Sequence, residues 1–204
     1  MVDGSVFDFE KNVRVTNQVV QLAQRKGISV EAELGTIGGA EDLVSARKIL
    51  YTDPELVKEF VSRTGCDFLA VAIGTSHGAY KFAGKPRLRM DILKEIRKSV
   101  SIPLVLHGAS GVYPALVKQA QRYGARLSGV QGVPEVQVRQ AIRSGIAKIN
   151  TDTDLRLAFD AAIRKVIATQ PTDFDPRHIL GPARDAIQKI VEQRIRLFGS
   201  GGKA

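Results

Sequence analysis

The sequence predicts an α/β fold in which helices cover a parallel β-sheet. Segments of strand length alternate with segments of helical periodicity, and no two strand segments are joined by a hairpin turn signal. The segment 68–73 is a continuous apolar run, which is typical of a parallel strand that helices bury on both faces. These observations favour repeated β-α units over an antiparallel sheet.

Strands are expected in five segments, at 1–2, 28–33, 68–73, 102–106 and 146–149. Five parallel strands suit a doubly wound sheet, whereas a complete (β/α)8 barrel needs eight strands and about 250 residues. No G-x-G-x-x-G fingerprint follows a strand, so a dinucleotide-binding fold has no support. We find no internal repeat or linker and expect a single domain over residues 1–204.

Helices are expected between these strands because capping residues bracket the apolar periodicity. Apolar residues recur at helical spacing from Phe9 to Ala23, and Gly27 closes that helix. Asp53 caps the next helix, which ends at Gly65. Further helical patterns surround Ile92 to Ile96, begin at Pro114 and Pro134, and fill 154–168 and 183–198.

Composition narrows the class of protein. The chain is 44% hydrophobic, which is enough for a buried core and argues against disorder. No apolar run is long enough to span a membrane, and no signal peptide is visible. The single cysteine, Cys66, precedes an apolar run and is expected to be buried in a reducing compartment. These features predict a cytoplasmic protein without a membrane partner.

The charge balance suggests an anionic partner. The net charge is +9, from 30 basic and 21 acidic residues, and this suits either nucleic acid or phosphorylated sugars. The basic residues are scattered along helices, are not clustered with aromatic residues, and tryptophan is absent. Nucleic-acid binding is therefore disfavoured.

Polar residues and glycines gather where the predicted strands end. Glu31 and Glu33 share one face of their strand. Three turns follow later strands: GTSHG at 74–78, HGASG at 107–111 and NTDT at 150–153. In a parallel barrel these ends converge on one rim, where active sites lie. His77 and His107 could meet there on one metal ion, and the glycine after each would let backbone N–H groups approach a phosphate.

Each of these features also has a simpler structural interpretation. The HGASG segment can be an ordinary β-α turn, and Asp152 or Thr153 can be only the cap of the following helix. Glu31 and Glu33 can be solvated, and Arg177 can be a surface charge. The residues alone predict a metal- and phosphate-binding rim and leave these alternatives open.

Several segments together resemble one known family. They read EAELGTIGGAED at 31–42, GTSHGAYK at 74–81, LHGASG at 106–111, KINTDTD at 148–154 and DPR at 175–177. This combination, in this order over nearly the whole chain, is similar to the class II fructose-bisphosphate aldolases. The resemblance implies a (β/α)8 TIM barrel, and this chain would supply an incomplete one, roughly units 4–8 plus the C-terminal helices.

The resemblance also implies that the chain is a fragment. In the family, the first three β-α units precede the position of Met1, and they carry a third zinc-ligand histidine and an aspartate acid/base. The segment 1–5 looks like the family's fourth strand. His178, next to Arg177, would be a poor substitute ligand.

Particular residues take roles from the resemblance. His77 and His107 match two zinc ligands, and Glu33 matches a carboxylate at the metal site. Glu41, in the mobile loop after that strand, matches the acid implicated in proton transfer at the ketone's carbon. Asn150 matches a residue that hydrogen-bonds the substrate's oxygens. The pocket for the phosphate of dihydroxyacetone phosphate would be formed by Gly78, Lys81, Gly108, Ser110, Asp152 and Thr153.

The implied reaction is the reversible cleavage of fructose 1,6-bisphosphate to dihydroxyacetone phosphate and glyceraldehyde 3-phosphate, in glycolysis and gluconeogenesis. Its cofactor would be Zn²⁺, with a monovalent cation or a second divalent metal as further candidates. Arg177 matches an arginine that holds the second phosphate in a neighbouring subunit's site, and the full-length protein would be a homodimer or homotetramer.

Two alternatives to this function stay open. A tagatose-bisphosphate aldolase shares the same motifs, and a non-catalytic remnant could keep only the phosphate-binding half of the rim. Because the family's third zinc-ligand histidine and its aspartate acid/base are absent from these 204 residues, we expect the chain as given not to catalyse aldol cleavage.

Overall fold

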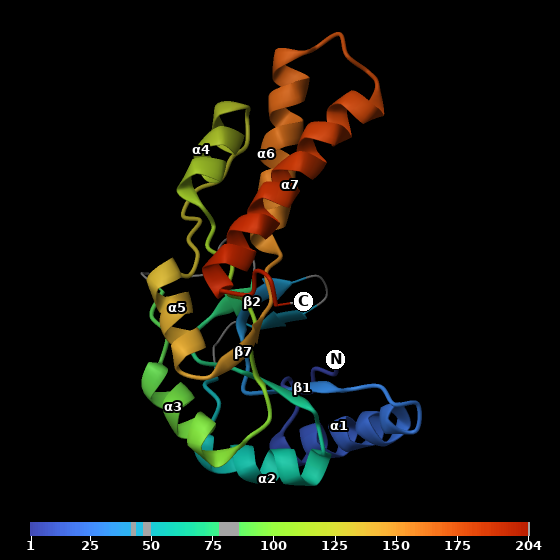
Figure 1. Ribbon diagram of the computed structural model, residues 1–204, viewed down its shortest axis with the longest axis vertical. Helices are drawn as coiled ribbons and strands as arrows, with labels where there is room; N and C mark the ends of the chain where they lie inside the picture. Colours follow the sequence, from blue (N-terminus) through green and yellow to red (C-terminus); the bar gives the residue numbers. More distant parts are fainter. Residues whose placement is uncertain (42–43, 47–49, 78–85, 204) are drawn as a thin grey trace.

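The computed structural model describes residues 1–41, 44–46, 50–77 and 86–203, with the backbone alone for 38–41, 44–46 and 77. Strands and helices alternate along this part of the chain, as the sequence predicts (Figure 1). In chain order the elements are α1 (Phe9–Gln24), β1 (Glu31–Leu34), β2 (Gly38–Glu41), β3 (Val44–Ala46), α2 (Pro54–Thr64), β4 (Phe68–Val71), β5 (Ser76–His77), α3 (Met90–Ser99), β6 (Leu104–Leu106), α4 (Pro114–Arg122), α5 (Glu135–Arg143), β7 (Ile146–Ile149), α6 (Thr153–Thr169) and α7 (Pro176–Phe198).

The main sheet has four parallel strands in the order β1-β4-β6-β7. Consecutive strands of this sheet are therefore spatial neighbours, as they are in the wall of a barrel. In the part of the chain that the structure describes, β1 and β7 form its two edges and the wall stays open. The predicted strand at 1–2 is reduced to one parallel bridge between Val2 and Ala32. The fold is an incomplete barrel, as expected.

Helix boundaries follow the capping residues. The Asp53 side chain accepts a hydrogen bond from the Glu55 amide, and Gly65 ends α2 in a left-handed conformation with φ of 70°. The last helix is longer than the predicted 183–198, because it begins at Pro176 and continues through Pro182. A proline inside a helix interrupts the sequence pattern, so the first two turns of α7 could not be read from the sequence.

A second, small sheet was not predicted. It has the order β3-β2-β5, with β2 and β3 antiparallel and β2 and β5 parallel. The lack of hairpin signals in the sequence is therefore misleading for β2 and β3, which pair antiparallel. Its adjacent glycines, Gly38 and Gly39, have low strand propensity, so the strand pattern is weak there.

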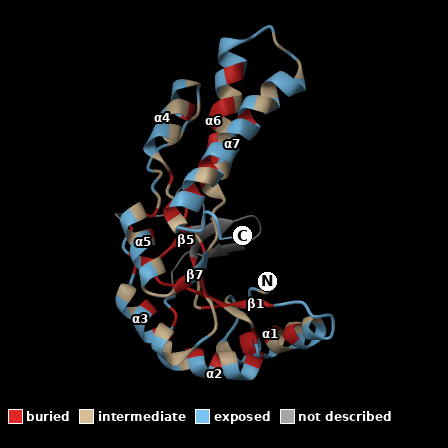
Figure 2. Ribbon diagram, in the orientation of Figure 1, coloured by how far each residue is buried: buried red, intermediate tan, exposed pale blue. Residues whose placement is uncertain are grey.

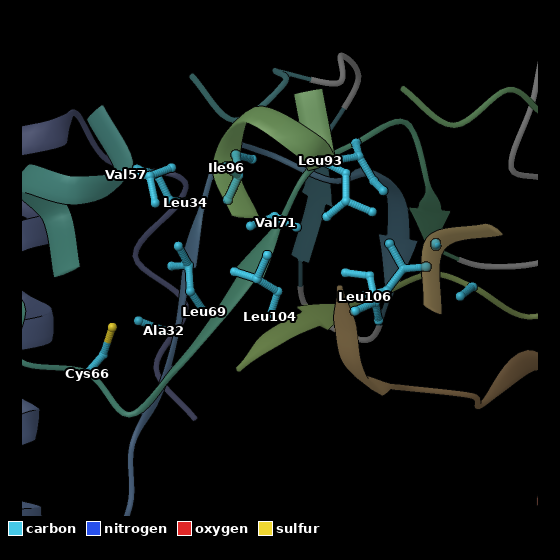
Figure 3. Packing of buried hydrophobic residues seen from close by; sticks show 14 of the residues in the cluster. Ala32, Leu34, Val57, Cys66, Leu69, Val71, Leu93, Ile96, Leu104 and Leu106 are labelled. Atoms are coloured by element: carbon cyan, nitrogen blue, oxygen red, sulfur yellow. The ribbon is translucent and has the colours of Figure 1, made fainter. Parts of the chain in front are cut away.

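The core lies between the main sheet and the helices beside it. Leu69, Leu104 and Leu106 come from β4 and β6, and they meet Leu93 and Ile96 of α3 (Figure 3). All five side chains are fully buried, and burying a leucine or isoleucine contributes about 1.5–3 kcal/mol. This packing fixes the position of the strand ends.

The helices are divided between two places. α1, α2, α3 and α5 lie along the sheet, whereas α4, α6 and α7 extend away from it to one end of the molecule (Figures 1 and 2). A smaller apolar cluster joins α4 to α6, built from Val112, Ala120, Leu157 and Ala161. Among the described helices, none combines the length and the apolar character that crossing a membrane requires.

Candidate functional site

Three buried ionisable side chains meet on one face of the main sheet. His107 follows β6, and its Nε2 lies 2.8 Å from Oε1 of Glu31 while its Nδ1 lies 3.2 Å from Oε2 of Glu33. The exposed fractions of His107, Glu31 and Glu33 are only 3%, 7% and 3%. The two carboxylates therefore face one imidazole in a site from which water is largely excluded, which rules out the solvated interpretation of Glu31 and Glu33.

The β-sheet register explains how these residues reach one another. Ala70 of β4 pairs with Glu33 on one side and with Val105 on the other. Paired residues of parallel strands project from the same face of the sheet, and residues two apart share a face. His107, Glu31 and Glu33 thus lie on the face opposite Leu69, and the small Ala70 side chain leaves room between them.

Further polar groups hold the two glutamates. Lys148 Nζ of β7 donates to Oε2 of Glu31 at 2.6 Å. Asn12 Nδ2 of α1 donates to the Glu33 carbonyl at 2.9 Å, and Ser5 Oγ donates to a Glu33 carboxylate oxygen at 3.4 Å. The network therefore draws on the first helix and on three strands, so it depends on the tertiary fold.

The contacts set the charge states of the network. Burial on its own would lower the pKa of His107, but its hydrogen bonds with Glu31 and Glu33 outweigh burial and raise the pKa to about 9. Burial would raise the pKa of Glu31, whereas hydrogen bonds from His107 and Lys148 leave it below its ordinary value. An imidazolium between two carboxylates is the expected state when no metal ion competes for these groups.

The donor types fit a zinc ion. Zinc in proteins takes imidazole nitrogen and carboxylate oxygen, and a ligating histidine commonly gives its other ring nitrogen to a carboxylate. Glu31 occupies that orienting position on Nε2, and Nδ1 faces Glu33. Among the described residues no group of three or more histidine, cysteine, aspartate or glutamate side chains is arranged so that it could hold a metal ion, so the fit is one of donor chemistry and not of a complete ligand set.

Several expected site residues are described incompletely. The His77 backbone lies in β5 beside Gly39, and the Glu41 backbone ends β2 of the same small sheet. Their side chains lie outside the described residues, as do Gly78 and Lys81 entirely. The structure thus brings the backbones of His77 and Glu41 into one small sheet and leaves the assigned contacts of all four residues as predictions.

The turn of residues 107–112 passes close to the rim. Gly108 has φ of 60°, and a Cβ there would lie 2.7 Å from the Ser76 carbonyl oxygen, so only glycine fits this close approach. The Ser110 side chain is buried, and its carbonyl accepts from the Val133 amide at 2.9 Å. This turn is therefore tightly packed on both of its sides.

The last predicted turn leads into a helix N-terminus. The backbone N–H of Asn150 donates to the Leu106 carbonyl at 3.0 Å, which connects this turn to the end of β6. Thr153 begins α6, and the side chain of Asp152 makes no capping hydrogen bond and pairs instead with Arg156 at 2.7 Å. The amides at the start of a helix favour anions, so this end of α6 suits a phosphate.

Arg177 lies apart from these residues. Its side chain is 86% exposed, and its Nε donates to the Asp175 carboxylate at 3.0 Å. It belongs to the first turn of α7, at the end of the molecule farthest from the sheet (Figure 1). His178 is bound there to Asp173 at 3.0 Å, so neither residue joins His107 within this chain.

Comparison with known proteins settles the family. Residues 1–203 match the family model described as fructose-bisphosphate aldolase class-II. The chain belongs to this family. The resemblance seen in the sequence motifs is therefore confirmed.

Named relatives of this aldolase family match over the whole chain. A fructose-bisphosphate aldolase from Thermus caldophilus is 50% identical over 206 aligned residues, which are 100% of this chain and 68% of the relative. A fructose-bisphosphate aldolase from Giardia intestinalis is 47% identical and is covered to 64%. The chain therefore spans about two thirds of the length of these relatives.

Solved aldolase structures share the fold. The YdjI aldolase from Escherichia coli K12 superposes with a TM-score of 0.72 at 37% identity, over 100% of this chain and 60% of that chain. A fructose-bisphosphate aldolase from Campylobacter jejuni, at 24% identity and a TM-score of 0.67, shows the likeness of fold alone, over 97% of this chain and 57% of that chain.

The aldolase motifs did not point to every residue of the network. Lys148 stands inside the KINTDTD segment, and a lysine within a strand was the available signal that it has a charged partner. Asn12 carried no signal, because its partner, the Glu33 carbonyl, lies 21 residues away in the chain.

Proposed function

We propose that the full-length protein acts as a class II aldolase, a lyase that reversibly cleaves fructose 1,6-bisphosphate to dihydroxyacetone phosphate and glyceraldehyde 3-phosphate. Family membership over residues 1–203 and relatives named for this activity support the proposal. The observation that carries it is the buried His107 between Glu31 and Glu33 at the end of β6. The reaction would belong to glycolysis and gluconeogenesis and would take place in the cytoplasm.

The metal-binding part of the proposal rests on donor chemistry. His77, His107 and Glu33 would hold Zn²⁺, with Glu31 orienting the His107 ring through Nε2. Zinc, when bound, supplies Lewis-acid polarisation of the ketone carbonyl. Of this chain's own residues, His107 and then Lys148 hydrogen-bond the Glu31 carboxylate and lower its pKa, so Glu31 is ionised beside the imidazole.

The phosphate-binding part rests on backbone geometry. Gly108 and Ser110 in the 107–112 turn, with Asp152 and Thr153 at the start of α6, would bind the phosphate of dihydroxyacetone phosphate together with Gly78 and Lys81. The close approach at Gly108 and the burial of Ser110 support this assignment. Backbone N–H groups at a helix start carry partial positive charge that favours a dianion.

Proton transfer and substrate orientation complete the proposal. Glu41 would move the proton at the ketone's carbon, and Asn150 would hydrogen-bond the substrate's oxygens. Arg177, exposed at the outer end of α7, would bind the second phosphate in a neighbouring subunit. A homodimer or homotetramer is the assembly that gives Arg177 this role.

Zinc binding by variants of the chain tests the metal assignment. The unmodified chain should bind zinc, and His107→Ala should lower its zinc affinity by at least about tenfold because a ligand is lost. His178→Ala is the matched control, because that histidine is exposed and paired only with Asp173 among the described residues. Equal zinc affinity in His107→Ala and the unmodified chain, measured by competition with a chelator, would contradict the proposal.

Exchange of the carbon-bound proton of dihydroxyacetone phosphate tests the reaction itself. The zinc-loaded full-length protein should exchange this proton with solvent, and Glu41→Ala in it should slow exchange by about 10²–10⁴-fold while dihydroxyacetone phosphate binding stays within about threefold. Glu95→Ala, on the exposed surface of α3, should leave exchange unchanged. Normal exchange in Glu41→Ala would move the proton-transfer role to another residue.

A further inference from the structure

A buried ion pair lies directly behind the 107–112 turn. Asp154 belongs to the first turn of α6, and Arg194 belongs to the last part of α7. Their exposed fractions are 0% and 3%, and Nη2 of Arg194 donates to Oδ2 of Asp154. The pair therefore joins α6 to α7 beside the 107–112 turn.

Asp154 holds the turn by its backbone. Its Oδ2 accepts from the Gly111 amide at 2.9 Å, and its Oδ1 accepts from the Val112 amide at 2.7 Å. Val112 has φ of 46°, which a β-branched residue rarely adopts. The carboxylate thus holds the backbone in a conformation that the side chain of Val112 does not favour.

Arg194 packs closely against this turn. Its guanidinium lies 4.8 Å from the centre of the Tyr113 ring, within the range of a cation-π contact. A Cβ on Gly111 would lie 2.6 Å from Nη2, so the turn packs directly on the guanidinium. Nε and Nη1 of Arg194 are buried and have no hydrogen-bond partner in the described part of the chain.

Stability alone is a poor explanation for such a pair. Desolvating two charges costs as much as their attraction returns, and well-packed apolar residues often replace a buried ion pair without loss of stability. Two guanidinium nitrogens without partners add to that cost. What apolar residues cannot do is hold a carboxylate in one orientation toward two amides.

We propose that Arg194 is a positioning residue for phosphate binding, which acts through Asp154 on the 107–112 turn. It fixes the carboxylate, the carboxylate fixes the Gly111 and Val112 amides, and Ser110 and Gly108 are thereby held in the conformation that receives the phosphate. The inference rests on the proposed function, because it takes this turn to be the phosphate site.

Three variants separate positioning from simple support of the fold. Arg194→Met removes the guanidinium and leaves Asp154 as an uncompensated buried charge. Arg194→Met combined with Asp154→Asn removes both charges, so the fold should regain most of the lost stability. Arg194→Lys keeps a cation with a different shape. Arg196→Met is the control, because Arg196 lies on the same helix and is exposed beside Glu192.

The measurement is the affinity of the ¹⁵N-labelled chain for inorganic phosphate and for dihydroxyacetone phosphate, followed at the amides of residues 108–112. We expect Arg194→Met and the double variant to bind both ligands about tenfold more weakly, since an aligned hydrogen bond to a charged group is lost. Arg194→Lys should bind the ligands more tightly than Arg194→Met but more weakly than the unmodified chain. Arg196→Met should bind them as tightly as the unmodified chain does. Hydrogen exchange at Gly111 and Val112 should accelerate in the double variant although its unfolding midpoint is restored.

The outcomes distinguish this inference from the function on which it rests. If phosphate and dihydroxyacetone phosphate leave the amides of the unmodified chain unmoved, the turn is not a phosphate site and both proposals fail. If the unmodified chain and a folded double variant bind dihydroxyacetone phosphate equally well, the pair only supports the fold, and Arg194 loses its positioning role while the proposed function stands.

Discussion

The two buried charged clusters of this aldolase chain differ in how they are assembled. The His107–Glu31–Glu33 cluster takes its members from strand β1 and from the residue that follows β6, and both strands are part of one parallel sheet. The Asp154–Arg194 cluster takes its members from helices α6 and α7 and holds two amides of the 107–112 turn. One cluster presents side chains for chemistry, and the other holds the backbone beside it.

This difference decides what removing a residue should do. In the sheet cluster, Glu31 pairs with both His107 and Lys148, and His107 pairs with both Glu31 and Glu33. In the helix cluster, Arg194 has Asp154 as its one ionic partner among the described residues. We therefore expect the removal of one partner to cost more stability in the helix cluster, and to lower zinc affinity more in the sheet cluster.

The largest effect is expected for Asp154→Ala. It removes the acceptor of two amide hydrogen bonds and leaves a buried guanidinium uncompensated, so unfolding should become easier by about 3–5 kcal/mol. Urea denaturation followed by circular dichroism measures this change. Asp160→Ala on the same helix is the control, because Asp160 is 42% exposed and forms an i,i+4 pair worth about 0.3–0.5 kcal/mol. Equal losses in both variants would erase the distinction between the clusters.

An intermediate effect is expected for Glu31→Gln. Glutamine keeps the shape but weakens the orienting hydrogen bond to Nε2 of His107, so zinc affinity should fall by about 10–100-fold. The free energy of unfolding of the metal-free chain should change less than in Asp154→Ala. A chelator competition assay gives the affinity, with Glu95→Gln on the surface as the control. Unchanged zinc affinity would show that Glu31 does not orient the ligand.

The smallest effect is expected for Lys148→Met. The lysine side chain is half exposed, and an ion pair of this kind contributes about 0–1 kcal/mol. Zinc affinity should therefore fall by no more than about fivefold, which the same competition assay resolves. A loss as large as that of Glu31→Gln would mean that Lys148 fixes Glu31, and the sheet cluster would then depend on single partners as the helix cluster does.

Much of the sheet could be predicted from the sequence, because its information is local. The segment 146–149 was predicted with the bounds that β7 has, and the helix after Asp53 begins and ends at its capping residues. The sequence also placed Glu31 and Glu33 on one face of their strand, but it left their burial open, and their contact with His107 depends on the register of the sheet. The metal and substrate roles assigned to these residues stay predictions.

The rest depends on contacts between distant segments. Nothing near Arg194 in the sequence marks it as buried, because its partner is 40 residues away, and an arginine in a helix is usually on the surface. The small sheet of β2, β3 and β5 was missed because Gly38 and Gly39 suggest a loop. The start of α7 was missed because Pro182 lies within it.

Ala70 limits which side chains this rim can accommodate. It contacts no substrate in the proposed function, yet it stands on the strand between the one that carries Glu33 and the one that leads to His107. Two steps between neighbouring strands cover about 9.5 Å, and a glutamate and a histidine can meet across that distance only above a small residue. An isoleucine or phenylalanine at this position would insert its side chain between the imidazole and the carboxylate. The small side chain of Ala70 in β4 therefore leaves the space in which side chains from the β1 and β6 sides can contact each other.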